Sequence, residues 1–148
     1  MRQLIEIAGG GIAGLSLGVA LRERGVPVRL FEAGRYPRHR LCGEFLNGVS
    51  EETLRSLGVV DLFADACRHR EMTWWRGGDF LTRGRLSKAA LGLSRWALDQ
   101  RLAERFVDLG GELCEGQRVK DFRGEGRVDA RGRVYQKTSR LLGLKAHF

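Results

Sequence analysis

The 148-residue sequence predicts an α/β fold built around a parallel β-sheet. Three observations near the amino terminus support this fold class. An apolar stretch, Leu4–Ala8, runs into a turn rich in glycine; a helix-like segment follows over Ala13–Arg24, and a second apolar stretch spans Val28–Phe31. Strand, turn, helix and strand within about thirty residues form a βαβ unit, whose crossover makes the two strands parallel.

Each element of this unit has a local reason. Leu4, Ile5, Ile7 and Ala8 make the first strand too apolar for an exposed edge, which indicates a strand buried inside a sheet. The helix carries Leu15, Val19 and Ala20 on one face. It is followed by Gly25, a favoured residue just past a helix end, and by Pro27, which prevents continuation. The second strand ends at Glu32.

The middle of the chain is less regular. Residues 33–48 form a loop rich in Gly, Pro and Arg, and Ser50 can cap a short helix that runs to Leu57. The stretch TWWRGGDF predicts a β-hairpin around Gly77-Gly78. Adjacent residues of a strand point to opposite faces, so we expect one of Trp74 and Trp75 in the core, with the other covering the hairpin or lining a cavity.

A second helix is predicted after Ser94, a favourable cap, and it ends at Gly110-Gly111. Its apolar side comprises Trp96, Leu98, Leu102, Phe106 and Leu109. The stretch ELCEGQRV predicts a further strand. No convincing strand is expected over residues 118–140, which are polar and rich in Gly and Arg.

Composition excludes several classes of protein. Three cysteines without C-x-x-C spacing argue against a disulfide framework or a structural zinc site and favour a reducing cytoplasm, and His39, His69 and His147 show no metal-ligand spacing. No apolar run is long enough to span a membrane. The net charge of +8 is concentrated after residue 117, where the sequence has nine Lys and Arg residues and three Asp and Glu residues. This tail lacks interleaved aromatics, so a solvated basic face is favoured and no nucleic-acid partner is expected.

The spacing Gly9-x-Gly11-x-x-Gly14 between a strand and a helix is typical of a Rossmann-type dinucleotide site. The first glycine permits the tight turn, the second lets a pyrophosphate approach the backbone, and the third allows close packing of helix and strand. The phosphates then lie at the positive end of the helix. Glu32, eighteen residues past Gly14, can accept hydrogen bonds from ribose hydroxyls. The βαβ unit alone does not distinguish FAD from NAD.

Together with the residues after Glu32, the βαβ unit resembles FAD-dependent oxidoreductases of the geranylgeranyl reductase and aromatic-hydroxylase type. IAGGGIAGLSLGVALRERGVPVRLFEAG is similar to their FAD fingerprint, YPRHRLCGEFLN to their Pro-Arg-x-x-x-Cys-Gly-Glu segment, and LSRWALDQRLAERFVDLGGELCEGQRV to their Ser-Arg-x-x-Leu-Asp helix. ARGR and GLKAHF are weaker matches. The resemblance implies non-covalently bound FAD, a Rossmann-type FAD domain, part of an antiparallel substrate region, a small organic substrate, and NAD(P)H or a protein as electron donor.

The resemblance also implies a set of cofactor-binding positions. These are Gly9, Gly11, Ile12, Ala13, Gly14, Glu32, Ala33, Arg40, Cys42, Gly43, Arg95 and Val119. In such proteins the position of Arg95 is directed at the flavin nucleotide, and the backbone at Val119 lies beside the adenine. The segment containing Arg38, Arg40, Cys42 and Gly43 runs near the flavin ring or pyrophosphate. No catalytic residue is identified.

For some of these positions a structural role is the alternative. Arg95 lies in the first turn of a helix, where the dipole disfavours a cation; this favours an anionic partner over a plain surface arginine. Arg38 and Arg40 are alternatively solubilising loop residues, and Cys42 a small buried filler.

Members of this group are considerably longer and carry a later Gly-Asp motif that this sequence lacks. We therefore expect a truncated or split FAD domain, with poor solubility or a partner chain that completes the fold. We divide it into a dinucleotide unit with its flavin-proximal loop (1–48), an inserted irregular and β region (49–93), a helix and strand of the FAD domain (94–119) and a basic tail (120–148). The alternative functions are an NAD-binding protein, a binder of acidic surfaces, and an inactive fragment.

Overall fold

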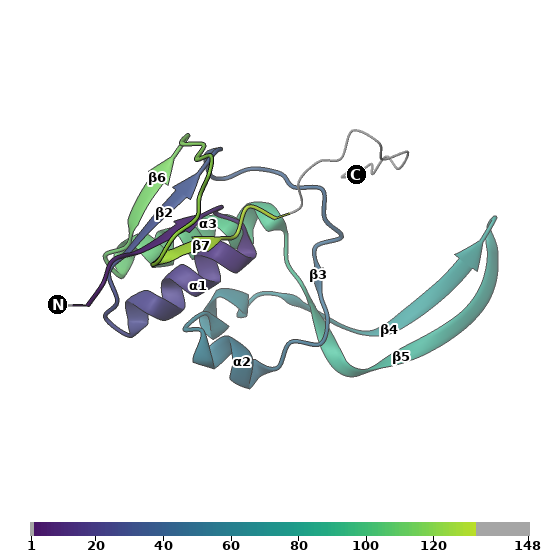
Figure 1. The fold of residues 1–148 in the computed structure, drawn as a ribbon. Helices are drawn as coiled ribbons and strands as arrows, with labels where there is room; N and C mark the ends of the chain where they lie inside the picture. Colours follow the sequence, from purple (N-terminus) through teal and green to yellow (C-terminus); the bar gives the residue numbers. More distant parts are fainter. Residues whose placement is uncertain (1, 133–148) are drawn as a thin grey trace.

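The computed structural model describes residues 2–132 and contains two separate β-sheets (Figure 1). The first is parallel and has the strand order β6-β2-β1-β7; the second is antiparallel, with the order β3-β5-β4. Helices cover the parallel sheet, while the antiparallel sheet reaches away from this body. The predicted α/β class with an additional antiparallel region is confirmed.

The parallel sheet contains β1 (Ile5–Ala8), β2 (Val28–Glu32), β6 (Glu112–Glu115) and β7 (Arg127–Asp129). Strands β1 and β2 run parallel, with Ile7 opposite Leu30, and both of these side chains are fully buried. The predicted βαβ unit is therefore correct, and β6 extends it beside β2. Strand β7, which the sequence analysis did not expect, pairs with the other edge of β1.

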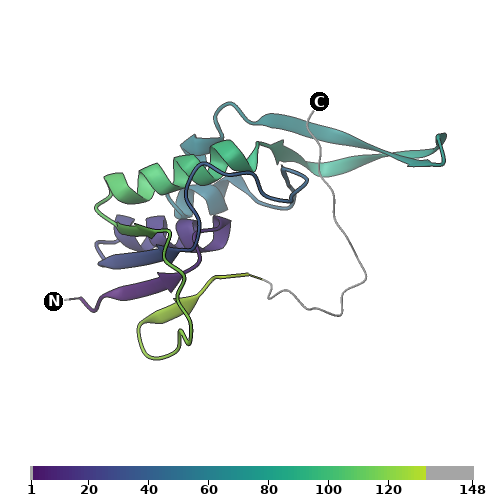
Figure 2. The same ribbon diagram turned by 90° about the horizontal axis from the view of Figure 1, so that it is seen from above.

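Two helices lie on one face of this sheet, α1 (Ile12–Glu23) and α3 (Arg95–Asp108). The steps from β1 to β2 and from β2 to β6 go the same way across the sheet, so right-handed crossovers place both helices on the same side (Figure 2). The two helices meet where Gly18 faces the ring of Phe106, which is fully buried. A methyl group on Gly18 would lie 2.9 Å from this ring, so the glycine sets how closely the helices approach.

Serine caps define two helix starts, as predicted. The Ser50 hydroxyl accepts a hydrogen bond from the Thr53 N–H and begins α2 (Glu51–Ser56), and Ser94 accepts one from Ala97 and begins α3. A short 3₁₀ helix, η1 (Val60–Phe63), follows α2. One expectation for α3 is wrong, because Trp96 is 43% exposed. Its ring contacts His39 in place of the core, since the position falls outside the stripe occupied by Leu98 and Leu102.

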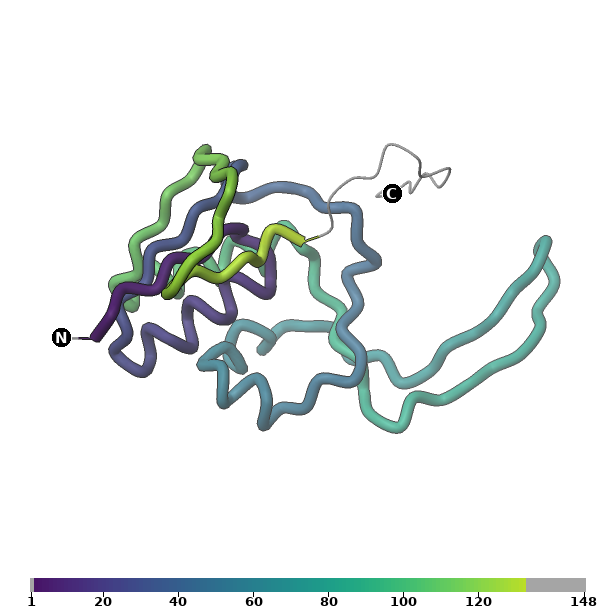
Figure 3. The backbone as a smooth tube through the Cα atoms, in the orientation of Figure 1, coloured from purple at the N-terminus to yellow at the C-terminus, as the bar shows by residue number. Residues whose placement is uncertain are grey.

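The antiparallel sheet is a long hairpin of β4 (Cys67–Arg76) and β5 (Asp79–Gly92), with β3 (Phe45–Leu46) paired to the base of β5. Its turn lies at Gly77-Gly78, as predicted, where both glycines have positive φ. The hairpin projects from the rest of the described chain (Figure 3), so the expectation that one tryptophan lies in the core is wrong. Trp74 is 59% and Trp75 61% exposed. Trp75 contacts Phe80 edge to face across the hairpin.

Within residues 2–132, no helix has the length and apolar character required to cross a bilayer.

Candidate nucleotide-binding site

The glycine turn joins β1 to α1, and two of its glycines are required by their surroundings. Gly9 has φ +105°, and a side chain there would place Cβ 2.5 Å from the carbonyl oxygen of Ala130, next to the end of β7. A Cβ on Gly14 would lie 1.9 Å from the carbonyl oxygen of Gly9. Both contacts are with backbone, which cannot move aside as a side chain can. The turn therefore has its tight form only with glycine at these positions.

At position 11, neither the backbone conformation nor the packing requires glycine. Its φ is −84°, and the nearest atom to an added Cβ is Nη2 of Arg95 at 4.0 Å. Gly11 is also the N-cap of α1, with no side-chain cap and no acidic residue in the first turn. The first N–H groups of a helix have no partners within the helix and carry partial positive charge. This end of α1 therefore offers donors and open space to an anion.

A cavity of about 740 Å³ opens over this end of α1. Its volume falls within the range typical of small-molecule and cofactor sites. It is lined by nine of the twelve cofactor-binding positions expected from the sequence: Gly9, Gly11, Ile12, Ala13, Glu32, Ala33, Arg40, Arg95 and Val119. Six basic side chains and a single acidic one, Glu32, are among its lining residues. The lining therefore carries more basic than acidic side chains, although Arg38, Arg40, Arg95 and Arg131 each contact a carboxylate.

Glu32 lies at the end of β2 and is 4% exposed. Its Oε2 accepts a hydrogen bond from the Gly10 N–H at 2.8 Å, and its Oε1 accepts from the Gly34 N–H and Arg38 Nη2, both at 2.7 Å. Burial by itself raises the pKa of this carboxyl, but the two backbone donors and the cations Arg38 and Arg40 outweigh it and bring the pKa below its ordinary value. Glu32 is thus a fixed carboxylate beside the glycine turn.

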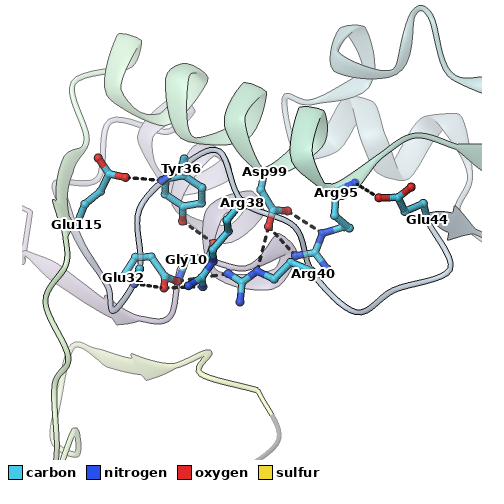
Figure 4. A network of polar contacts seen from close by, with 10 residues as sticks. Gly10, Glu32, Tyr36, Arg38, Arg40, Glu44, Arg95, Asp99 and Glu115 are labelled. Atoms are coloured by element: carbon cyan, nitrogen blue, oxygen red, sulfur yellow. Dashed lines mark hydrogen bonds and ion pairs between the residues drawn. The ribbon is translucent and has the colours of Figure 1, made fainter. Parts of the chain in front are cut away.

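A second buried carboxylate, Asp99, lies on α3 and joins two arginines (Figure 4). Its Oδ1 accepts from Arg95 Nε at 2.7 Å and its Oδ2 from Arg95 Nη2 at 2.8 Å, while Arg40 Nε lies 3.4 Å from Oδ2. Burial would lower the pKa of Arg95, but the hydrogen bond and charge of Asp99 raise it. The Arg95 side chain is 14% exposed, so it is not a plain surface arginine.

The loop before β3 connects the two carboxylate clusters. Glu44, at φ +56°, accepts the Arg95 N–H through its carboxylate at 2.9 Å and so caps α3 together with Ser94. Tyr36 donates its hydroxyl to the Gly10 carbonyl, and its own N–H donates to Glu115 on β6. Burial and the neighbouring charge of Glu32 raise the pKa of Tyr36. These contacts fix the loop against both the glycine turn and α3.

Three of the expected positions do not line the cavity. Gly14 is buried beneath the turn. Cys42 is half-buried and accepts the Glu44 N–H at 3.4 Å through its sulfur, and a Cβ added to Gly43 would have no atom within 4 Å. The hydrogen bond of Cys42 is therefore made within its own loop. Its sulfur also lies near the Arg95 guanidinium.

Sequence reasoning assigned no role to Asp99, Tyr36 or Glu44, although Asp99 and Glu44 close the two quoted segments that resemble family motifs. For Asp99 a signal was present: a carboxylate four residues after Arg95, between apolar positions of a helix, predicts an i,i+4 ion pair turned toward the core. Tyr36 and Glu44 lie in an irregular loop, and their partners are set by tertiary contacts alone.

Comparisons with known proteins identify the fold. A family model described as FAD binding domain matches residues 2–142. YetM of Bacillus subtilis (strain 168) is 41% identical over 69 residues, which make up 47% of this chain and 18% of YetM. FAD-dependent monooxygenase atnJ of Arthrinium sp is 31% identical over 139 residues, covering 78% of this chain and 33% of atnJ.

Among solved structures, the flavin-dependent monooxygenase PieE in complex with FAD and substrate is similar with a TM-score of 0.65 and 25% identity, over 78% of this chain and 24% of PieE. The chain spans 18% and 33% of the length of the two curated relatives described above. The family model decides between the two dinucleotides that the glycine turn left open. This chain belongs to the FAD binding domain family, and its cofactor is FAD.

Proposed function

We propose that FAD binds in the 740 Å³ cavity through its adenosine diphosphate half. In this proposal the pyrophosphate lies over Gly11 at the start of α1, where Arg95 and Arg40 face it. Glu32 accepts hydrogen bonds from the adenosine ribose, and the backbone at Val119 lies beside the adenine. The observation that carries the proposal is the open face of Gly11, which has a helix N-terminus on one side and a guanidinium on the other.

The residues present suit such a group. A diphosphate is negative on both phosphoryl groups, and the end of α1 offers unpaired N–H donors with no acidic side chain in its first turn. Arginine suits this task because its planar fork stays charged and binds phosphate oxygens in pairs. The alternative of a solubilising loop residue is weakened for Arg40 by its contacts with Glu32 and Asp99.

Glu32 also retains capacity for a sugar hydroxyl. A carboxylate has about four lone-pair sites, two on each oxygen. Hydrogen bonds from Gly34 and Arg38 occupy Oε1, whereas Oε2 accepts one, from Gly10. One ribose hydroxyl can therefore donate to Oε2 without displacing a protein donor.

We further propose that this chain serves a flavin-dependent monooxygenase or reductase acting on a small organic molecule, with NAD(P)H as electron donor. Support comes from the names of its relatives, of which it covers a third or less. Bound flavin supplies the two-electron redox chemistry, and the protein supplies binding and orientation.

A cytoplasmic location is part of the proposal, supported by three free cysteines. A partner chain that completes the fold is also proposed, supported by the exposed apolar side chains of Trp74, Trp75 and Phe80.

Titration of the purified chain with FAD, followed by flavin fluorescence, tests the binding proposal. We expect a saturable change in flavin fluorescence that ADP reverses by competition, because both ligands use the same half of the site. NAD serves as the comparison ligand. Absence of saturable FAD binding, or displacement of FAD by NAD but not by ADP, would contradict the proposal.

A further inference from the structure

We propose that Asp99 is a positioning residue that aims two arginines at the diphosphate, so that one buried carboxylate sets the preference of this site for phosphorylated ligands. The inference rests on the proposed function and adds to it a residue with no direct ligand contact.

The geometry joins three parts of the chain at one carboxylate. Asp99 is fully buried on α3, and it binds Arg95 from the first turn of the same helix through two hydrogen bonds of 2.7 and 2.8 Å. Arg40 reaches Asp99 from the loop after β2, 59 residues away in sequence. Neither arginine side chain is free in solvent, with exposures of 14% and 29%. Both guanidinium groups are thus held in one orientation.

That orientation brings positive charge close to the start of α1. Arg95 is the first residue of α3, where the dipole opposes a positive charge. Its Nη2 also faces Gly11, the start of α1, which is a second positive helix end. Two positive groups border the same open space, and a bound diphosphate would be attracted to both. Asp99 resists the outward swing that Arg95 would otherwise make toward solvent.

A purely structural role is a poor explanation for a charge at this position. The neighbouring positions Leu98 and Leu102 are buried and apolar, and an apolar residue in place of a buried ion pair is often neutral or stabilising. The pair of Arg95 and Asp99 as a whole, and not the carboxylate alone, therefore calls for a use beyond stability. The Arg38 and Glu32 pair, which Arg40 links to Asp99, supports the same interpretation, since it too holds a cation at the cavity wall.

The test compares ADP with adenosine, which share the nucleoside and differ in the phosphates. Isothermal titration calorimetry of each ligand is carried out on the wild-type chain and on Asp99→Asn, which keeps the shape and removes the charge. We expect Asp99→Asn to weaken ADP binding by about tenfold or more, as for loss of a charge-assisted contact, with adenosine affinity unchanged within about twofold. Asp99→Glu should recover part of the ADP affinity, because it restores the charge.

The matched control is Asp65→Asn, which removes a carboxylate that binds Arg101 at the protein surface, away from the cavity. It should leave both affinities unchanged. An equal loss of ADP and adenosine binding in Asp99→Asn would show a merely structural role, and unchanged or tighter ADP binding would also overturn the inference. If Asp99→Asn does not fold, Arg95→Gln decides: retained preference for ADP over adenosine overturns it. Failure of the wild-type chain to bind either ligand would instead refute the proposed function.

Discussion

Alanine substitutions at Gly14 and Gly11 should separate the two uses of glycine in the turn. At Gly14 the new Cβ would lie 1.9 Å from the Gly9 carbonyl oxygen, about 1.5 Å closer than ordinary van der Waals contact. Overpacking of this kind costs about 2–3 kcal/mol, and the helix propensity of alanine returns about 1 kcal/mol. We expect Gly14→Ala to lower the free energy of unfolding by about 1–2 kcal/mol.

Gly11→Ala should behave in the opposite way. Its φ of −84° suits any residue and the nearest atom is 4.0 Å away, so the loss of stability should be about 0.5 kcal/mol, as for an unfavourable N-cap. The methyl group projects into the cavity, however, and FAD affinity should fall by about tenfold.

Urea unfolding followed by circular dichroism measures stability for both variants, and flavin fluorescence measures affinity. Gly43→Ala is the matched stability control, because its new Cβ would have no atom within 4 Å. The reasoning is refuted if Gly14→Ala is as stable as the wild type, or if Gly11→Ala loses stability while binding FAD normally.

Three further predictions concern the core, the acid limit and a helix cap. Phe106→Ala, which removes a fully buried ring between α1 and α3, should cost about 3–5 kcal/mol in urea unfolding, and a loss under about 1 kcal/mol would contradict the assigned packing. The depressed pKa of Glu32 means that its contribution to stability is present above its ordinary pKa and is lost as pH falls toward the depressed value; unfolding free energies measured from about pH 6 to about pH 3 should decline less steeply in Glu32→Gln. Ser94→Ala should cost about 1 kcal/mol, and an unchanged midpoint would show that the cap of α3 is supplied by Glu44 alone.

The sequence by itself determined the parts of this protein that depend on neighbours along the chain. The strand Ile5–Ala8, the glycine turn, α1 and β2 follow from apolar periodicity and glycine spacing over about thirty residues. The serine caps and the hairpin turn at Gly77-Gly78 are equally local. Glycine spacing also placed Gly11 at the start of α1 and Glu32 at the end of β2, whereas Arg95 and Val119 were implied only by the resemblance to known flavoproteins.

Only the tertiary structure decided how distant segments complete the site. Strand β7 has three residues and no sequence signature; it exists as a strand because β1 offers it unpaired backbone groups. The expectations that Trp96 and one of Trp74 and Trp75 lie in the core were wrong, because burial depends on what packs against an element. Asp99 contacts Arg40, which lies 59 residues away in the sequence, and Glu32 accepts a hydrogen bond from the glycine turn 22 residues before it. Neither contact is visible in the local sequence. Local propensity specifies where helices and strands begin and end, whereas the charges that face a cavity are set by contacts between residues far apart in the chain.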